Sequence, residues 1–491
     1  MWAQLFKVLV LLITALIAVL GVRTWQLGNR LPPPPAAGGP PAQLPAAELA
    51  ETLGGALRIA TISDTDPTRH QSRAFEELAA YLELEFPLVH ANLRKTDFNG
   101  YGWLYQWQTA ASGGPALLLL AHSDVVPIEP GTEAHWQQPP FSGAISDGYI
   151  WGRGALDDKS SLLGWLEALE YLLAQGFEPE HPILLAVGHD EEVGGQLGAK
   201  VIADYLRAEG TEVGLALDEG GAVTLGIVPG VARPVANIMA AEKGYVSLEL
   251  TARADGGHSS TPPPQTAVGR LSRAVARLEA QQLPLNLRPP VTWMLERLSP
   301  ALPLMSRVAI ANRWLLEDQL IESLGGSRAG NALLRTTTAP TMLRAGVKDN
   351  VLATEARATV NFRILPGDTV ALVETHVRKV VDDEGIDIRR ASEFVSEPSA
   401  PADINSADFA VIAGAVRDLF PDVLISTGAV TGATDLRHYQ GLYRQRFNFV
   451  PLIYRADDLK RFHGRNERVS VDDYVRMVQC YVRIIERYNG S

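Results

Sequence analysis

Acidic side chains follow three apolar segments of the chain, at points where buried strands are expected to end. In order, these motifs are His122-Ser123-Asp124, Asp190-Glu191-Glu192 and Asp218-Glu219-Gly220, and a fourth segment, 152–159, adds Asp157-Asp158 just before an expected helix. The carboxyl ends of strands in an open α/β sheet meet at one edge, so we expect these side chains to gather there. So many desolvated acids would repel one another unless positive charge lay among them. The sequence therefore predicts a site for a pair of divalent metal ions.

Each of these motifs is weak evidence by itself. A His-x-Asp pair is often structural, Glu191 and Glu192 could form a solvated face, and Asp218 could cap a helix. Their occurrence after successive strands, in a chain with only 10 His, makes coincidence a poor explanation. His463 lies in a loop before the last expected helix. It is therefore a candidate ligand for the second ion.

The elements around these motifs alternate between strands and helices. The apolar runs at 116–121, 183–187 and 213–217 have the length and composition of strands that are buried on both faces. Segments with apolar residues at helical spacing lie between and around them, at 73–82, 162–173 and 197–206. This alternation predicts an α/β fold with a mostly parallel sheet flanked by helices. The pattern resumes near residue 398, with a helix at 407–420, a strand at 447–453 and a last helix from about 471.

A second domain interrupts this pattern. From residue 242 the apolar positions alternate with period two, as at 245–252 and 356–364, which is typical of strands with one wet face. With its helices, the order β-α-β-β-α-β predicts an inserted α+β open-faced sandwich. Between its first helix and second strand lie about fifty residues rich in Leu, Pro, Trp and Met, longer than a connection needs. This insert could be a packed excursion or dimer contact, or an apolar wall for a hydrophobic substrate.

The N-terminus has the composition of a membrane anchor. The segment 8–22 carries no charge, and apolar residues extend it at both ends toward the roughly 20 residues that span a bilayer. A cleaved signal peptide is the alternative, but no small-x-small cleavage site follows the run. We therefore expect an uncleaved single helix. Lys7 lies on one side of it and Arg23 and Arg30 on the other, so the positive-inside rule does not settle its orientation. The anchor and the apolar insert together favour a catalytic domain outside the cytoplasm (periplasm, lumen or exterior). The segment 31–46, LPPPPAAGGPPAQLPA, is typical of a semi-rigid spacer that holds a soluble domain off the membrane.

These patterns divide the chain into five parts. They are a transmembrane anchor at 1–30, a Pro-rich linker at 31–50, a catalytic domain at 51–241 and 398–491, and a lid or dimerisation domain at 242–397. The net charge of −12 argues against a nucleic-acid partner, because such proteins neutralise phosphates with Lys and Arg. The single cysteine, Cys480, excludes an internal disulfide framework and a Cys-based zinc module.

Seven segments resemble, in order and spacing, those of one enzyme family. They are AHSDVVP, WGRGALDDK, GHDEEVGG, LALDEGG, GGHSS, NVLATEARATVNFRILPGD and FHGRNERVS. They are similar to segments of the co-catalytic zinc metallopeptidases that include carboxypeptidase S, aminoacylase, glutamate carboxypeptidase and secreted N-acyl amino acid hydrolases. The resemblance runs from about residue 55 to the end. GHDEEVGG, TTTAPTMLRAGVKDN and the apolar insert make it closest to the branch of carboxypeptidase S and the N-acyl amino acid hydrolases.

The resemblance implies a role for each residue at the sheet edge. Asp157 would bridge two zinc ions, which cobalt or manganese could replace. His122 and Asp218 would complete one metal site, and Glu192 and His463 the other. Asp124 would hydrogen-bond the far nitrogen of His122 and so fix its tautomer. Glu191, left unligated, would act as general base.

The resemblance also implies roles for three residues of the second domain. His258 would reach the active site of a partner subunit and stabilise the oxyanion, which makes a homodimer necessary. Asn350 would bind the oxyanion side, and Arg363 would bind the free carboxylate of the substrate. A satisfied surface histidine and a buried structural ion pair are the alternatives for His258 and Arg363. A loop at 432–435, GATD, resembles a pocket lining, with Arg437 or His438 nearby.

The expected activity is hydrolysis of the amide bond before a C-terminal amino acid, by a dizinc carboxypeptidase or N-acyl amino acid hydrolase. An aminopeptidase or biosynthetic deacylase of the same fold is an alternative. Another is a catalytically inactive binding protein, which the complete ligand set disfavours.

Overall fold

A central sheet of eight strands organises the catalytic domain in the computed structural model, which describes residues 1–29, 38–64, 66, 72–109 and 113–490. The strand order is β1-β2-β6-β3-β7-β8-β16, and β18 pairs with β7 off this path. Their bounds are β1 (Arg94–Phe98), β2 (Gly102–Trp107), β3 (Ala116–His122), β6 (Ile183–Gly188), β7 (Val213–Thr224), β8 (Val235–Asn237), β16 (Leu424–Ser426) and β18 (Tyr443–Tyr454). β3 runs parallel to β6 and β7, and β7 runs parallel to β18. The continuous apolar runs thus form the buried parallel centre of the sheet, as predicted.

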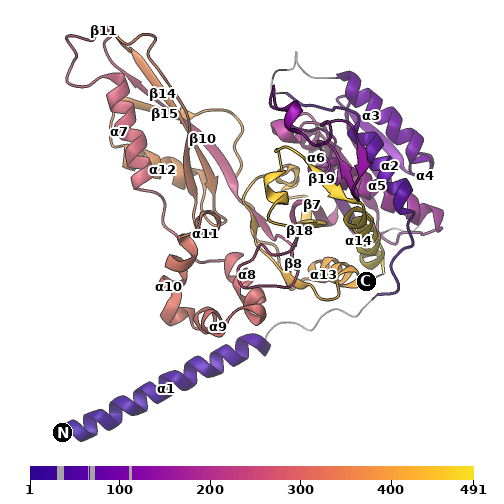
Figure 1. The fold of residues 1–491 in the computed structure, drawn as a ribbon, viewed down its shortest axis with the longest axis horizontal. Helices are drawn as coiled ribbons and strands as arrows, with labels where there is room; N and C mark the ends of the chain where they lie inside the picture. Colours follow the sequence, from indigo (N-terminus) through magenta and orange to yellow (C-terminus); the bar gives the residue numbers. More distant parts are fainter. Residues whose placement is uncertain (30–37, 65, 67–71, 110–112, 491) are drawn as a thin grey trace.

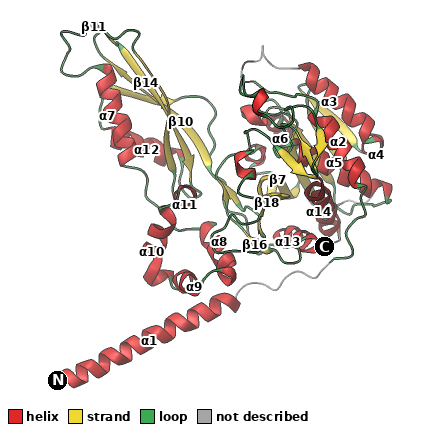
Figure 2. Cartoon of the chain, viewed as in Figure 1, coloured by secondary structure: helices red, strands yellow, loops and turns green. Residues whose placement is uncertain are grey.

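Helices cover both faces of this sheet (Figure 2). One apolar core packs α2, α5, α13 and α14 against the sheet, and another packs α6 on the opposite face. The helices are α2 (Ala46–Leu57), α3 (Ser72–Glu85), α4 (Pro87–Asn92), α5 (Lys159–Ala174), α6 (Ala199–Ala208), α13 (Ala407–Leu419) and α14 (Val471–Asn489). α2 begins at Ala46, inside the segment predicted as linker (31–50).

The strand ends lie where the sequence places them, with one exception. β3 ends at His122, which pairs in register with Gly188 at the end of β6. β7, however, continues to Thr224, because β18 pairs with it along its length, so Asp218 and Glu219 lie inside the strand. A small sheet of β4 (Ala144–Ser146), β5 (Tyr149–Trp151) and β19 (Arg468–Ser470) joins the segment before Asp157 to the segment after His463. A further short parallel pair joins β9 (Ala241–Glu242) to β17 (Ala429–Val430).

The inserted domain is the predicted open-faced sandwich. Its antiparallel sheet has the order β12-β14-β10-β15, with β10 (Gly244–Arg253), β12 (Thr337–Ala345), β14 (Glu355–Ile364) and β15 (Ile386–Arg390). α7 (Ala267–Ala280) and α12 (Val370–Val381) pack on one face and form its core. The short strands β11 (Gly257–His258) and β13 (Val351–Leu352) pair at the end of this domain that is distant from the catalytic domain (Figure 1).

The long insert and the N-terminus form helices beside each other. The insert folds as α8 (Val291–Leu298), α9 (Leu304–Ala311), α10 (Arg313–Gly325) and α11 (Arg328–Leu334). α1 (Trp2–Asn29) is the one described helix long and apolar enough to cross a membrane, and its C-terminal end lies against α9 (Figure 1).

Candidate active site

His122 is the central imidazole of the cluster at the sheet edge. It is 2% exposed, and its Nε2 lies 3.1 Å from Asp157 Oδ1 and 3.5 Å from Glu219 Oε1. Its Nδ1 lies 3.0 Å from the carbonyl oxygen of Asp124 and 3.2 Å from the Oδ1 atom of that residue. When Nδ1 donates its hydrogen to Asp124, Nε2 presents a lone pair toward the other carboxylates, which is the tautomer that a metal ligand needs.

Asp157 lies between two histidines. Its Oδ1 atom faces His122, and its Oδ2 atom lies 3.1 Å from Nε2 of His463. Burial raises the pKa of Asp157, but the hydrogen bonds from both imidazoles outweigh it, so the pKa lies below the ordinary value. The peptide bond between Asp157 and Asp158 is cis. One carboxylate that offers an oxygen to each imidazole has the position of a bridging ligand.

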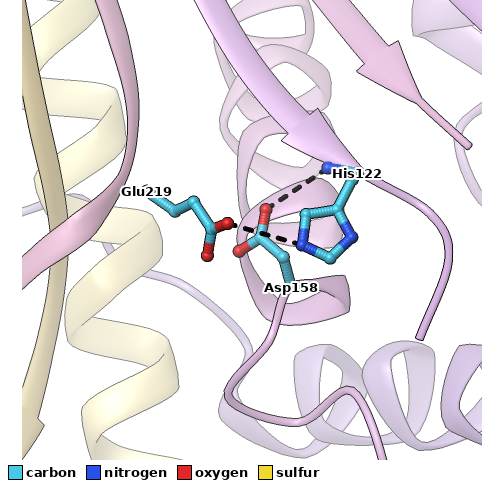
Figure 3. A group of neighbouring side chains, drawn as sticks. All are labelled: His122, Asp158 and Glu219. Carbon is cyan, nitrogen blue, oxygen red and sulfur yellow. Dashed lines mark hydrogen bonds and ion pairs between the residues drawn. The ribbon is translucent and has the colours of Figure 1, made fainter. Parts of the chain in front are cut away.

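Glu192 completes the second half of the cluster. Its Oε2 lies 3.3 Å from Nε2 of His463. The contacts with Asp157 and Glu192 raise the pKa of His463 to about 10. Among the residues that the structure describes, potential ligand atoms form two neighbouring groups, each within 4.8 Å, which are His122-Asp158-Glu219 and His122-Asp157-Glu192. Figure 3 shows the first group. The Glu219 carboxylate is directed toward the imidazole, and the Asp158 carboxylate accepts a hydrogen bond of 3.4 Å from the backbone N–H of His122.

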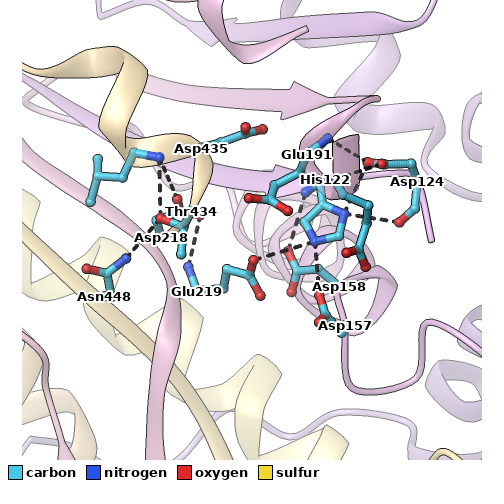
Figure 4. Close-up of polar contacts among 12 residues, drawn as sticks. His122, Asp124, Asp157, Asp158, Glu191, Asp218, Glu219, Thr434, Asp435 and Asn448 are labelled. Carbon is cyan, nitrogen blue, oxygen red and sulfur yellow. Dashed lines mark hydrogen bonds and ion pairs between the residues drawn. The ribbon is translucent and has the colours of Figure 1, made fainter. Parts of the chain in front are cut away.

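Asp218, the residue predicted to complete the His122 site, does not face His122. Its Oδ2 accepts a hydrogen bond of 2.9 Å from the backbone N–H of Leu436, and its Oδ1 accepts one from the N–H of Glu219 (Figure 4). Successive side chains of a strand point to opposite sides, so only one of these adjacent acids can face the cluster. In the structure the Glu219 carboxylate is the one that lies near His122, so Glu219 is a second candidate for the ligand role expected of Asp218.

The donor set fits a pair of metal ions. Oε1 of Glu192 and Oδ1 of Asp158 are buried, and neither has a hydrogen-bond partner in the part of the chain that the structure describes. Burial raises the pKa of Glu192, Asp158 and Glu219, because buried carboxylates resist ionisation when no cation is close. Carboxylate oxygens and imidazole nitrogens are ligands that zinc accepts. Bound cations would therefore satisfy both the orphaned oxygens and the excess of negative charge.

Glu191 lies beside the cluster but in neither ligand group. Its Oε1 lies 3.3 Å from Nη1 of Arg437, and the side chain is 11% exposed. Burial raises the pKa of Glu191 to about 8, against the opposing effect of Arg437. Arg437 in turn stacks on the ring of Phe394, 5.0 Å from its centroid. Arg437 follows the predicted pocket loop at 432–435, and its charge positions the Glu191 carboxylate.

Asp124 contacts both the imidazole of His122 and the turn that carries Glu191 and Glu192. Besides His122, its carboxylate accepts hydrogen bonds from the backbone N–H of Glu191 (3.2 Å) and of Glu192 (3.1 Å). The hydroxyl of Ser63 donates a further bond of 2.6 Å. The side chain that orients the imidazole therefore also fixes the turn that carries both glutamates.

Glu467 was not identified from the sequence. It is completely buried, lies 2.5 Å from Nη1 of Arg153, and accepts hydrogen bonds from the N–H groups of Gly154 and Leu156. Arg153 also donates to the carbonyl of Gly464, next to His463. The only sequence signal was a charged residue in each of the two segments that carry Asp157 and His463.

The three lid residues lie in two places. Arg363, on β14, stacks on the ring of Tyr245 at 4.8 Å, and the charges of Arg437 and Glu191 influence its pKa, which burial lowers. His258 lies on β11 at the distant tip, where its Nδ1 bonds to the Ser260 hydroxyl. The carbonyl of Asn350 accepts a bond from Ser259 at the same tip. Within one chain, His258 and Asn350 are therefore not part of the cluster.

Comparisons with known proteins found relatives that are similar in sequence and solved structures that are similar in fold. The chain is 37% identical over 443 residues to an N-fatty-acyl-amino acid synthase/hydrolase of Xenopus tropicalis, covering 89% of this chain and 85% of that protein. It is 36% identical over 445 residues to a probable carboxypeptidase S-like protein of Dictyostelium discoideum, with the same coverage. Among solved structures, an M20 family metallo-carboxypeptidase of Sulfolobus solfataricus shares the fold, with a TM-score of 0.66 and 18% identity over 90% of this chain and 100% of that one. Human carnosine dipeptidase 1 does so with a TM-score of 0.65 and 15% identity over 96% and 99% of the two chains.

The family comparison covers most of the catalytic and lid domains. The description "Peptidase family M20/M25/M40" matches residues 118–487, which include both candidate ligand groups, the inserted domain and the loop of His463. Members of this family are hydrolases that depend on a metal, usually zinc. The chain therefore belongs to peptidase family M20/M25/M40.

Proposed function

We propose that this protein hydrolyses the amide bond that joins an acyl or aminoacyl group to a C-terminal amino acid. The observation that carries the proposal is the position of Asp157 between His122 and His463, with Glu191 beside the pair but outside it. The names of the relatives, an N-fatty-acyl-amino acid synthase/hydrolase and a carboxypeptidase S-like protein, favour this class of amide.

Two zinc ions would share Asp157. His122 and Glu219 would complete one site, with Asp158 in reach, and Glu192 and His463 would complete the other. Glu219 takes the place that the sequence alone gave to Asp218. Bound zinc supplies Lewis-acid chemistry, since it acidifies water to a pKa of about 7 and polarises a carbonyl group.

Glu191 would move the proton. Because it is tied to Arg437 and not to a histidine, its carboxylate is free to accept the proton of the attacking water and to deliver it to the leaving amine. Nearby cations would lower its pKa from the value of about 8 that burial produces, so that it is ionised near neutral pH. Arg437 would then hold the carboxylate in place during the transfer.

Arg363 would bind the free carboxylate of the substrate, and a second subunit would supply His258 and Asn350. The planar N–H fork of an arginine side chain pairs with a carboxylate at two points. The edge strand β12 and the turn after it expose apolar side chains, namely Met342 (46%), Leu343 (62%) and Val347 (92%). An exposed apolar edge strand is normally covered, and a partner's lid would cover it.

We also propose that α1 remains attached as a membrane anchor.

A substrate panel tests the activity. Zinc-loaded full-length protein is offered N-acyl amino acids, Gly-Xaa dipeptides and C-terminally amidated dipeptides, and release of free amino acid is measured with Glu191→Gln as the control for contaminating activity. Release from the first two classes alone supports the proposal. Release from the amidated dipeptides would instead indicate an aminopeptidase, and no release from any class by zinc-loaded protein would refute hydrolysis of this kind.

A further inference from the structure

Four large apolar side chains are exposed on the helical insert beside α1. They lie at the starts of α9 and α10 and are Leu304 (63% exposed), Met305 (76%), Trp314 (57%) and Leu315 (45%). We call these four residues the insert patch. Their helices lie between the lid and the C-terminal end of α1 (Figure 1). The apolar residues of the insert are therefore only partly used in packing.

The end of α1 is docked onto the same helices. Leu27 is buried in a cluster with Leu295 and Ile310. The amide of Asn312, which is fully buried, donates to the carbonyl of Leu20 at 3.3 Å and lies 3.5 Å from the hydroxyl of Thr24. These contacts fix the position of the insert along the axis of α1.

The length of the apolar segment places the membrane surface at this contact. The charge-free run at 8–22 spans only about 22 Å at 1.5 Å per residue, whereas the hydrocarbon core of a bilayer is about 30 Å thick. The core must therefore extend close to Arg23. The guanidinium of Arg23 lies 5.9 Å from the centroid of the Trp314 ring. Arginine and tryptophan together are typical of the boundary between hydrocarbon and headgroups.

The described part of the Pro-rich segment also runs along the protein. The N–H of Gly38 donates to Asp418 at 2.6 Å, and Gln479 of α14 donates to the carbonyl of Ala42. From Gly38 onward, the segment does not project as the expected spacer. Residues 31–37 lie outside the described residues. The chain between α1 and α2 is thus attached to the folded protein on both sides of the residues that are not described.

We propose that the insert patch docks into the lipid bilayer that α1 crosses, in the leaflet next to Arg23. The bilayer is the occupant because α1 brings it to the level of Trp314, and because side chains such as Leu304 and Met305 are suited to the boundary between headgroups and acyl chains. The inference rests on the proposed retention of α1 as an anchor. The domain then lies on the membrane with a fixed orientation, and apolar substrates dissolved in the bilayer are close to it.

The experiment uses the single cysteine of the chain. Cys480 is fully buried, so a cysteine introduced by Met305→Cys can be labelled selectively with the fluorophore NBD. Leu84→Cys on α3 is the matched control, because Leu84 is 75% exposed and lies on the catalytic domain far from α1. Leu304→Cys is a second test variant. The full chain is reconstituted in lipid nanodiscs with or without brominated lipid, and retained hydrolysis shows that each variant is folded.

The expected result is a blue-shifted emission at position 305 that brominated lipid quenches at least twofold, and no quenching at position 84. Equal, weak quenching at positions 304, 305 and 84 in protein that elutes with the discs would overturn the docking while leaving the anchor intact. A blue shift without quenching that grows with the number of chains per disc would overturn it in favour of a second copy. Active protein that does not elute with discs at all would refute the anchor and the docking together, but not the hydrolase activity.

Discussion

Replacing Glu467 with Gln should destabilise the catalytic domain and weaken metal binding, although Glu467 is not a proposed ligand. Its carboxylate pairs with Arg153, which is 3% exposed, and accepts backbone N–H groups of the loop that leads to Asp157. Glutamine keeps one acceptor oxygen for those N–H groups. It removes the negative charge opposite Arg153. The substitution therefore tests the contribution of the ion pair while the hydrogen bonds to the backbone are kept.

The size of the effect follows from burial. Breaking a buried ion pair by removing one partner costs about 3–5 kcal/mol, because the other charge remains buried and uncompensated. At roughly 2–4 °C per kcal/mol for a domain of this size class, the midpoint of thermal unfolding should fall by on the order of 10 °C. Arg153 also holds the carbonyl of Gly464, so the loop of His463 should loosen. Loss of such supporting contacts lowers metal affinity about 10–100-fold.

Thermal unfolding followed by circular dichroism in the absence of metal measures the first effect, and zinc titration against a chromophoric chelator measures the second. Glu212→Gln is the matched control, since Glu212 pairs with Arg444 at 2.9 Å but both side chains are mostly exposed, so its midpoint should stay within about 2 °C of the wild type. Adding Arg153→Met to Glu467→Gln should recover part of the lost stability, because no unpaired charge remains. The reasoning would be refuted if the unfolding midpoint of Glu467→Gln equalled that of the control variant. It would also be refuted if the double variant had a midpoint far below that of Glu467→Gln.

Three further predictions address the site directly. Glu191→Gln should lower kcat by about 10²–10⁴-fold while zinc content measured by atomic emission stays near wild type, and a loss of zinc would instead make Glu191 a ligand. Glu219→Ala should bind fewer zinc ions per chain than wild type, whereas Asp218→Asn, which keeps an acceptor for Leu436, should bind as many; the reverse result would restore Asp218 as the ligand. Mixing inactive His258→Ala and Glu191→Gln subunits should restore partial activity if each site takes His258 from its partner, and no recovery after subunit exchange would count against a shared site.

The fold was largely predictable because its strands are simple. β3 and β6 are continuous apolar runs, and such runs form the interior of a parallel sheet because both faces are covered by helices. The period-two segments of the lid were equally clear, because α7 and α12 pack on one face of that sheet and the other face carries polar side chains such as Glu249 and Arg357. The extension of β7 to Thr224 was not predictable from its own residues, because it depends on pairing with β18, more than two hundred residues away along the chain.

The site was predictable in its residue types but not in all its contacts. The motifs around His122 and Glu191 could be placed at one sheet edge because parallel strands end together. The choice between Asp218 and Glu219 depends on the phase of a strand, and a shift by one residue exchanges the two faces. Arg153 and Glu467 are ordinary charged residues in the sequence, and their importance follows only from the complete burial of Glu467.

The two halves of the cluster are held by different contacts. These contacts determine which half should be disturbed when Glu467 is replaced. His122 is 2% exposed and held by Asp124, which Ser63 and two backbone N–H groups hold in turn. The side chain of His463 is 53% exposed, and its loop is tied to the rest of the site through Gly464 and Arg153. Loss of the Glu467 charge frees Arg153 but touches none of the contacts around Asp124. The half of the site with His463 should therefore lose its geometry first, while His122 keeps its tautomer and position.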